Sequence, residues 1–135
     1  MIKDVTHNDI ENMRVCRNKW QRLGIFRQAV DITADQQQEW FDTTLNKGFI
    51  INGRAWGKVY SSGEVSFYGF DTWLVNDIKE IIKNSKQSVL HGECYLNNPF
   101  LGLWLDAGFK VVNYKSNRKC YQGRMWDGLE LEYQK

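Results

Sequence analysis

Two glutamates on predicted strands are the residues best placed to take up a proton. Glu64 opens the segment EVSFYGF, and Glu93 lies within VLHGECYL. A carboxylate can act as a general base, directly or through one water molecule. Side chains alternate between the two faces of a strand, so Glu93 and its neighbour Cys94 point in opposite directions. We take Glu64 and Glu93 as the candidate catalytic residues and expect Cys94 to be a packed, inert thiol.

The other titratable residues give weaker signals. His91 has a pKa range suited to proton transfer but no partner in the sequence pattern. Tyr68 and Tyr95 carry phenols, although aromatic residues on strands normally pack in the core or against cross-strand neighbours. No metal site is expected, because His7 and His91 have no neighbouring ligands at zinc spacing.

A basic segment near the N-terminus forms a local cluster of charge. Its members are Arg14, Arg17, Lys19, Arg22 and Arg27. Trp20 and Phe26 lie among them, a pattern compatible with a phosphate-bearing or nucleic-acid partner. Acidic residues nearby favour a solvated helix surface instead, so we do not expect nucleic-acid binding.

Length and composition limit the class of protein. The chain has 135 residues, a formal net charge of +2, 14% aromatic residues and three cysteines. A single domain over 1–135 can bury a core at this size, and the charge is too small to argue for nucleic acid or membrane. Unpaired cysteines fit a reducing compartment. With a polar N-terminal sequence and no long apolar run, we expect a cytoplasmic protein without a membrane span.

Local signals place these residues on alternating helices and strands. The predicted strands cover 49–51, 55–60, 64–70, 89–96, 109–114 and 125–133. Asn52-Gly53 predicts a tight hairpin between the first two strands, and Arg118-Lys119 is expected to lie in a turn before the last one. Helices are expected after Thr6, after the capping box that starts at Thr33, and over 73–85 with Asp71-Thr72 as the cap.

The segment YLNNPFLGLWLDAGFKVV predicts a strand, a short helix and a second strand. Asn98 can cap a helix whose first residue is Pro99, because proline has no N–H to satisfy. Gly108 can adopt the left-handed conformation that ends a helix. In the form Asn97…Leu103-Trp104…Gly108-Phe109, this unit resembles the C-terminal motif of the GCN5-related N-acetyltransferase (GNAT) superfamily.

A second stretch supports the resemblance. Arg17-Asn18, Ile32-Thr33 and Trp40-Phe41 are similar to the opening of members that act on small amines and amino sugars. The resemblance covers essentially the whole chain in element order. It implies an α/β fold with a mixed, mostly antiparallel central sheet, a splayed pair of parallel strands and about four flanking helices.

The resemblance also implies a cofactor and a site. The pantetheine arm of acetyl-CoA would lie between strands 64–70 and 89–96. Cofactor-binding residues would be Tyr68, Gly69, Phe70, Thr72, Trp73, Asn97 and Trp104. Arg17 and Trp20 would shape the acceptor pocket, and Glu64 or Glu93 would deprotonate a small-molecule or protein amine.

Two departures from the family pattern make this a short, degenerate member. The glycine-rich loop that normally binds the pyrophosphate is absent, and Asp71-Thr72-Trp73 stands in its place. Asp71 would put a negative charge where the pyrophosphate should lie. Trp104 occupies the position of the tyrosine that usually protonates the leaving thiolate, and an indole N–H cannot do so.

Three interpretations therefore stay open. The first is an acetyl-CoA-dependent N-acyltransferase that works by direct attack of the amine. The second is a non-catalytic binding or structural module, since small proteins of this kind also resemble some phage-encoded proteins and virus-particle components. The third is a nucleic-acid-associated module using the basic segment. A homodimer through Trp126, Leu129 and Leu131 is an expected arrangement for any of them.

Overall fold

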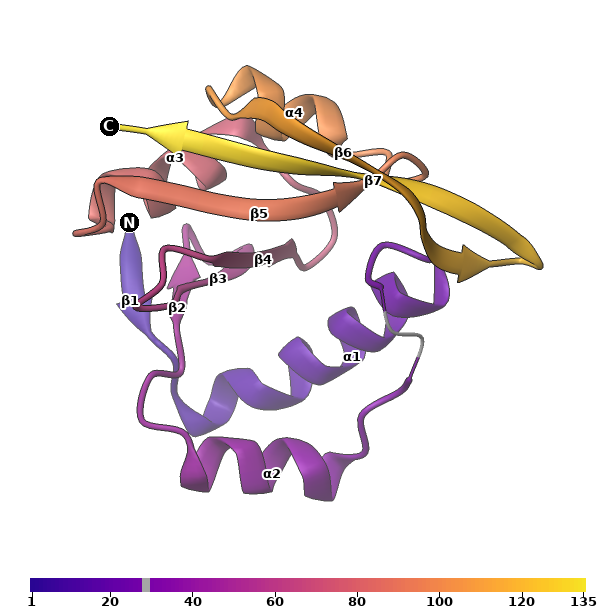
Figure 1. Ribbon diagram of the computed structural model, residues 1–135. Coiled ribbons are helices and arrows are strands. Elements are labelled where there is room, and N and C mark those ends of the chain that lie inside the picture. The colour runs from indigo at the N-terminus through magenta and orange to yellow at the C-terminus, as the bar shows by residue number, and fades with distance from the viewer. Residues whose placement is uncertain (28–29) are drawn as a thin grey trace.

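The computed structural model describes residues 1–27 and 30–135. Its helices are the 3-10 turn η1 His7–Asp9, α1 Ile10–Arg22, α2 Ala34–Thr43, α3 Val75–Asn84 and α4 Leu101–Asp106. Its strands are β1 Ile2–Asp4, β2 Phe49–Ile51, β3 Ala55–Val59, β4 Val65–Gly69, β5 Val89–Tyr95, β6 Lys110–Tyr121 and β7 Arg124–Gln134. Helices α1 and α2 lie on one side of the strands, and α3 and α4 lie on the other (Figure 1).

Two local sequence signals are confirmed by the hydrogen bonds and dihedral angles. Thr33 Oγ1 accepts the Gln36 N–H at 3.2 Å, and Gln36 Oε1 accepts the Thr33 N–H at 2.9 Å, so the capping box starts α2. Asn52 and Gly53 have φ angles of 52° and 70°, the conformation that a two-residue hairpin between β2 and β3 requires.

The strands form two antiparallel sheets that touch at one end. The first has the order β1-β2-β3-β4, and the second has the order β5-β7-β6. An isolated parallel bridge joins Glu64 to His91, where the His91 N–H donates to the Gly63 carbonyl at 3.0 Å. Gly63 allows this approach, because a Cβ there would lie 2.4 Å from the Val89 carbonyl oxygen. The expected mixed sheet with a splayed parallel pair is therefore confirmed.

Consecutive residues of β4 face the two helical layers. Phe67 packs edge-on against Trp73 and Trp104, with ring centroids 5.2 and 5.6 Å apart. Tyr68 points the other way and donates its hydroxyl to the Met13 carbonyl of α1 at 3.3 Å. Each face of β4 is therefore covered by aromatic packing, as the period of two in its sequence predicts.

The predicted start of the third helix is wrong. Residues 71–74 form a loop, Leu74 is the N-cap, and α3 begins at Val75. The cap comes from inside the helix, because Asp77 Oδ2 accepts the Leu74 N–H at 3.2 Å. Asp77 is buried and also accepts from Arg54 Nε at 3.0 Å, so a distant residue fixes the start of the helix.

Two boundaries near the C-terminus also differ from the prediction. Arg118 and Lys119 lie inside β6, and the turn falls at Gln122-Gly123, where φ is 53° and 71°. Helix α4 begins at Leu101 and not at Pro99. Asn98 Oδ1 accepts the Phe100 N–H at 2.8 Å and closes a turn before the helix.

No helix within residues 1–27 and 30–135 has the length and hydrophobicity needed to cross a lipid bilayer.

The proposed dimer contact needs correction at one residue. Leu131 is 2% exposed and belongs to the core, so it is not available at the surface of the chain.

Candidate functional site

The two sheets separate beyond the bridge, and β4 presents an edge to the gap. The Phe70 N–H bonds to the Arg54 carbonyl at 2.8 Å, so even-numbered residues of β4 direct their main-chain groups toward β3. Main-chain direction alternates along a strand. The N–H and C=O of Phe67 therefore face the gap.

Strand β5 presents a matching edge from the other side. The Leu96 N–H donates to the Asp127 carbonyl of β7 at 3.0 Å, whereas the His91 N–H donates toward the first sheet. By the same alternation, the main-chain groups of Glu93 face the gap. Donors and acceptors of two strands thus line both sides of one opening.

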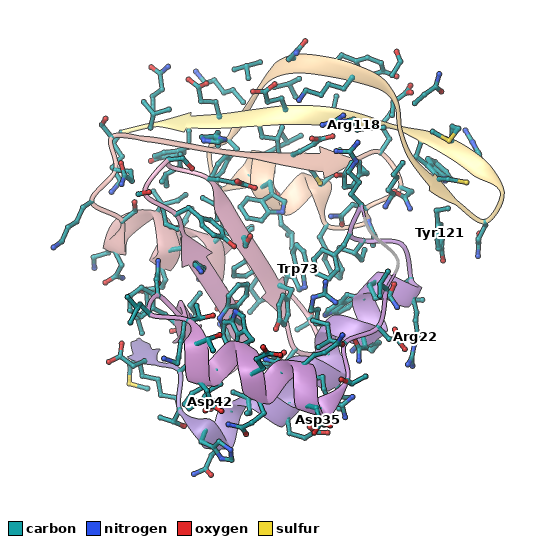
Figure 2. All side chains as sticks on the ribbon, turned by 60° about the horizontal axis from the view of Figure 1, so that its bottom comes forward. Arg22, Asp35, Asp42, Trp73, Arg118 and Tyr121 are labelled. Atoms are coloured by element: carbon teal, nitrogen blue, oxygen red, sulfur yellow. The ribbon has the colours of Figure 1, made fainter. Side chains whose placement is uncertain are left out.

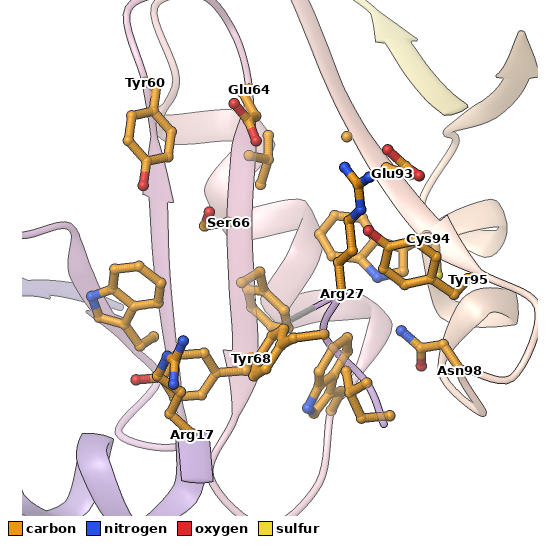
Figure 3. A pocket seen from close by; sticks show the side chains of 18 of the residues that line it. Arg17, Arg27, Tyr60, Glu64, Ser66, Tyr68, Glu93, Cys94, Tyr95 and Asn98 are labelled. Atoms are coloured by element: carbon orange, nitrogen blue, oxygen red, sulfur yellow. The ribbon is translucent and has the colours of Figure 1, made fainter. Parts of the chain in front are cut away.

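A cavity of about 860 Å³ opens between the sheets and is also lined by residues of α1 and α2. In Figure 3, Arg17, Tyr60, Glu64, Ser66 and Tyr68 lie on its β3–β4 side. Arg27, Glu93, Cys94, Tyr95 and Asn98 lie on its β5 side. The cavity therefore combines the open strand edges with charged and polar side chains.

Ion pairing distinguishes the two candidate bases. Glu93 Oε1 accepts from Arg118 Nε at 2.7 Å, and Lys115 Nζ lies 3.9 Å from the other carboxylate oxygen. Glu64 is exposed where the sheets meet, and it forms no ion pair within the described part of the chain. Glu93 is held by cations of β6, so Glu64 is the carboxylate that can approach a ligand.

Burial keeps three other groups of the cavity protonated at neutral pH. It raises the pKa of Cys94 to about 12 and the pKa of Tyr95 to about 12. It also raises the pKa of Tyr68 well above the ordinary value for a phenol. These groups can position a ligand, but they do not supply a thiolate or a phenolate.

The two residues expected at the acceptor pocket are separated. Arg17 lines the cavity, with its guanidinium 5.7 Å from the Phe26 ring centroid and Nη1 donating to the Val30 carbonyl at 3.3 Å. Trp20 is buried in the core, where its indole N–H donates to the Gly69 carbonyl. Trp20 therefore holds the end of β4 through the Gly69 carbonyl and does not line the cavity.

An aromatic cluster closes the α3–α4 side of the gap. Trp73 stacks on Phe100 with 4.4 Å between ring centroids and meets Trp104 edge-on at 6.4 Å. Trp73 lies in the interior between the layers (Figure 2) and is 3% exposed. Its Nε1 is buried and has no hydrogen-bond partner among the described residues. A buried donor without a partner is costly, so it marks a position suited to a ligand acceptor atom.

The N-terminus of α3 holds carboxylates of its own. Asp77 is fully buried and accepts from the Leu74 N–H, from Arg54 Nε and from Asn52 Nδ2 at 2.8 Å. Asp71 stands at the same end with a side chain that is 99% exposed. The positive end of the helix dipole is therefore already occupied by a carboxylate, Asp77, which is paired with Arg54.

The structure divides the predicted site residues into two groups. Those that line the cavity are Arg17, Glu64, Tyr68, Trp73, Glu93 and Trp104. Those outside its lining are Trp20, Gly69, Phe70, Thr72 and Asn97. Asn97 Nδ2 donates to the Gly24 carbonyl at 3.1 Å, and its neighbour Asn98 lines the cavity instead.

Several lining residues carried no functional prediction from the sequence. Ser66 shares a face of β4 with Glu64, a relation that strand alternation could have indicated. Arg27 was visible as a member of the basic segment, but its position in the cavity depends on the loop after α1. Arg118 was expected in a turn, and its contact with Glu93 follows from the unexpected length of β6.

Solved structures similar to this chain include acetyltransferases. A spermidine N-acetyltransferase from Vibrio cholerae, solved with CoA and spermine, matches with a TM-score of 0.80 and 11% identity, over 99% of this chain and 94% of that chain. An N-acetyltransferase from Staphylococcus aureus Mu50 matches with a TM-score of 0.76 and 15% identity, over 99% of this chain and 97% of that chain. The chain has the GNAT fold.

A GNAT superfamily phosphinothricin acetyltransferase from Sinorhizobium meliloti, solved with acetyl-CoA, also matches, with a TM-score of 0.75 and 11% identity, over 99% of this chain and 87% of that chain. No protein-family model and no curated protein matches the sequence. This chain therefore shares its overall fold with acetyltransferases named for different acceptors.

Proposed function

We propose that the protein is an N-acyltransferase that transfers an acyl group, such as acetyl, from coenzyme A to an amine. The observation that best supports this proposal is the gap between β4 and β5, where main-chain groups of Phe67 and Glu93 face a cavity of about 860 Å³. Structural neighbours with CoA or acetyl-CoA bound share this fold, and one of them is a spermidine N-acetyltransferase.

The residues of the gap fit the pantetheine arm. An extended chain with amide groups can bind an open strand edge as an added strand would. The main chain of Phe67 offers a donor and an acceptor, and Trp73 Nε1 is a buried donor that lacks a partner among the described residues. These groups would hold the arm beside the cavity that receives the amine.

The residues at the start of α3 do not fit the diphosphate. A diphosphate needs free main-chain N–H groups and positive charge at a helix N-terminus. Here the Leu74 N–H is already bonded to Asp77, and the carboxylates of Asp77 and Asp71 already engage Arg54 and Lys19, two cations at this helix end. We therefore assign no step to the nucleotide end of the cofactor.

The chemistry of the chain's own residues favours direct attack by the amine. When bound, acetyl-CoA supplies an acyl thioester. Glu64 accepts a proton from the amine, directly or through one water molecule. The Phe67 N–H faces the gap and would be available either to the pantetheine arm or to an acyl oxygen that gains negative charge. Cys94, with its pKa raised to about 12, stays a thiol and does not act as a nucleophile.

Calorimetry with acetyl-CoA tests the proposal first. Micromolar binding supports it, whereas no heat at millimolar cofactor would overturn it. That second result would favour a non-catalytic binding module, the interpretation consistent with the carboxylates at α3 and with Trp104 in place of a tyrosine. Acetyl transfer to a mixture of small amines, followed by mass spectrometry, tests turnover directly.

The first prediction concerns Glu64. We expect Glu64→Gln to lower acetyl transfer by about 100-fold, because loss of a general base typically costs that much, while acetyl-CoA binding is unchanged. Steady-state rates and calorimetry on the same preparations check it. Glu39→Gln on the exposed surface of α2 is the matched control, and a Glu64→Gln variant with the rate of this control contradicts the assignment.

A further inference from the structure

The cavity is lined by more positive than negative charge. Its cationic lining residues are Arg17, Arg27 and Arg118, and its carboxylates belong to Glu64 and Glu93. Arg118 and Glu93 form an ion pair at 2.7 Å and offset each other. Two guanidinium groups and one exposed glutamate remain.

Arg17 is half-buried and forms no ion pair in the described part of the chain, and the charge that lies near it, Asp31, is paired with Arg22. Its contacts are the Phe26 ring and the Val30 carbonyl, both of which are uncharged. Burial lowers the pKa of Arg17 from its ordinary value. A cation that is partly removed from water without a charged partner carries an uncompensated cost, which an anion bound beside it would relieve.

Arg27 approaches the same cavity from the loop after α1. Figure 3 shows its side chain reaching into the pocket on the side of Glu93 and Tyr95. It forms no ion pair in residues 1–27 and 30–135, and Glu93, on the same side of the cavity, is already bonded to Arg118. A second cation therefore faces the cavity without a dedicated partner.

Other arginines of the basic segment behave differently. Arg14 pairs with Glu11, and Arg22 pairs with Asp31, where hydrogen bonding to Arg22 lowers the pKa of the carboxyl. These two arginines do not line the cavity. Within the basic segment, the arginines that face the cavity are thus the ones without a carboxylate partner among the described residues.

We infer that the acceptor is an amine that also carries a carboxylate or phosphate group, with the positive charges of Arg17 and Arg27 attracting the anionic group from opposite sides of the cavity and Glu64 facing the amine. This inference rests on the proposed acyl transfer for the role of the amine. The binding of the anionic group does not depend on turnover. A polyamine is the opposite kind of ligand, because its second charge would face two guanidinium groups.

Binding to four small amines, measured by calorimetry without any acyl donor, tests the inference. The probes are 4-aminobutyrate, 3-aminopropylphosphonate, butylamine and putrescine. We expect the two anionic amines to bind at least about tenfold more tightly than butylamine and putrescine, as charge-assisted hydrogen bonds to guanidinium predict. The carboxylate and the phosphonate distinguish the two kinds of anionic group.

Variants locate the binding to the two arginines. Arg17→Gln and Arg27→Gln should each weaken binding of the better anionic amine by about tenfold and leave butylamine unchanged. Arg17→Lys keeps the charge and should lose less, which separates recognition from a packing defect. Arg124→Gln removes the same charge from the exposed turn end of β7 and serves as the control.

The outcomes separate this inference from the proposed function. If putrescine binds as tightly as the anionic amines, or if neither arginine variant weakens binding, the inference is overturned while acyl transfer can still be observed on other amines. If the anionic amines bind through the two arginines but no acetyl transfer follows, the proposed function fails and the anion site stands.

Discussion

The ammonium group of Lys119 is buried between β6 and the end of α1. Lys119 is 4% exposed, donates to the Gly24 carbonyl and lies 4.5 Å from the Tyr95 ring centroid. Burial lowers its pKa to about 8 from the ordinary value of 10.5. Between these pH values the unfolded chain binds more protons than the folded chain, so the contribution of this group to stability rises with pH across that window.

The second prediction follows from this dependence of stability on pH. We expect Lys119→Met to be more stable than the parent at pH 7, by about 1–3 kcal/mol, and the difference to shrink by pH 10. The Gly24 carbonyl keeps a donor in the variant, because Asn97 Nδ2 also bonds to it. Urea unfolding at both pH values measures the effect. Lys110→Met on the exposed start of β6 is the control, and an unchanged difference at the two pH values contradicts the prediction.

At the residue scale, the sequence showed which carboxylates exist but not how they are paired. Glu64 and Glu93 were equivalent candidates, because both lie on predicted strands. Their difference comes from Arg118, which is separated from Glu93 by 25 positions and reaches it through pairing of β5, β7 and β6. No local pattern carries that information, since it depends on strand order.

At the scale of elements, the sequence predicted a helix start correctly where the capping residues lie within one turn of each other. The start of α2 was predicted correctly, because Thr33 and Gln36 satisfy each other across one turn. The start of α3 was not, because Asp77 caps the helix from within and is fixed by Arg54, 23 positions earlier. The missed helix start also bears on binding of the acyl donor, since the Asp77 carboxylate occupies the Leu74 N–H at the end of α3 where a diphosphate would need free N–H groups.

The third prediction concerns this cap. We expect Asp77→Ala to lower the free energy of unfolding by about 3–5 kcal/mol, because it removes a helix cap and leaves the Arg54 guanidinium without its partner. Denaturant unfolding followed by circular dichroism measures it. Asp71→Asn is the matched control at the same end of α3, and it should change stability by less than about 0.5 kcal/mol. Equal effects of the two substitutions would be inconsistent with a buried cap.

The fourth prediction compares two acyl donors. If the nucleotide end finds no binding site at α3, acetyl-CoA and S-acetylpantetheine should bind with dissociation constants within about fivefold of each other. Competition calorimetry measures both. Asp71→Lys should then favour acetyl-CoA selectively, because it replaces a negative charge with a positive one at the helix end. A much tighter constant for acetyl-CoA with the unaltered chain would show that the nucleotide binds elsewhere.

At the scale of the molecule, the order of elements was predicted well because helices and strands alternate clearly in the second half. The depth and lining of the cavity were not predictable in the same way. They arise because α1, α2 and the loop after α1 bring Arg17 and Arg27 against the open edges of β4 and β5. The short β1 was also missed, since Ile2–Asp4 becomes a strand by pairing with β2, far along the chain.

The fifth prediction uses the strand edges. The amides of Phe67 and Glu93 face the gap, whereas those of Tyr68 and Cys94 face neighbouring strands. Hydrogen exchange measured by nuclear magnetic resonance should therefore be at least about tenfold faster at Phe67 and Glu93 than at their neighbours. Acetyl-CoA should slow these two amides if the arm binds between the strands. Equal rates along each strand would mean that the edges are already closed.

The two sheets are joined at the Gly63 end by a short parallel bridge and separate beyond it. At this bridge Gly63 lies so close to Val89 that a side chain on Gly63 has no room. Beyond the bridge, Trp73, which follows β4, stacks on Phe100, which follows β5. A methyl group added at Gly63 would therefore push β4 and β5 apart at the bridge and change their separation along the cavity.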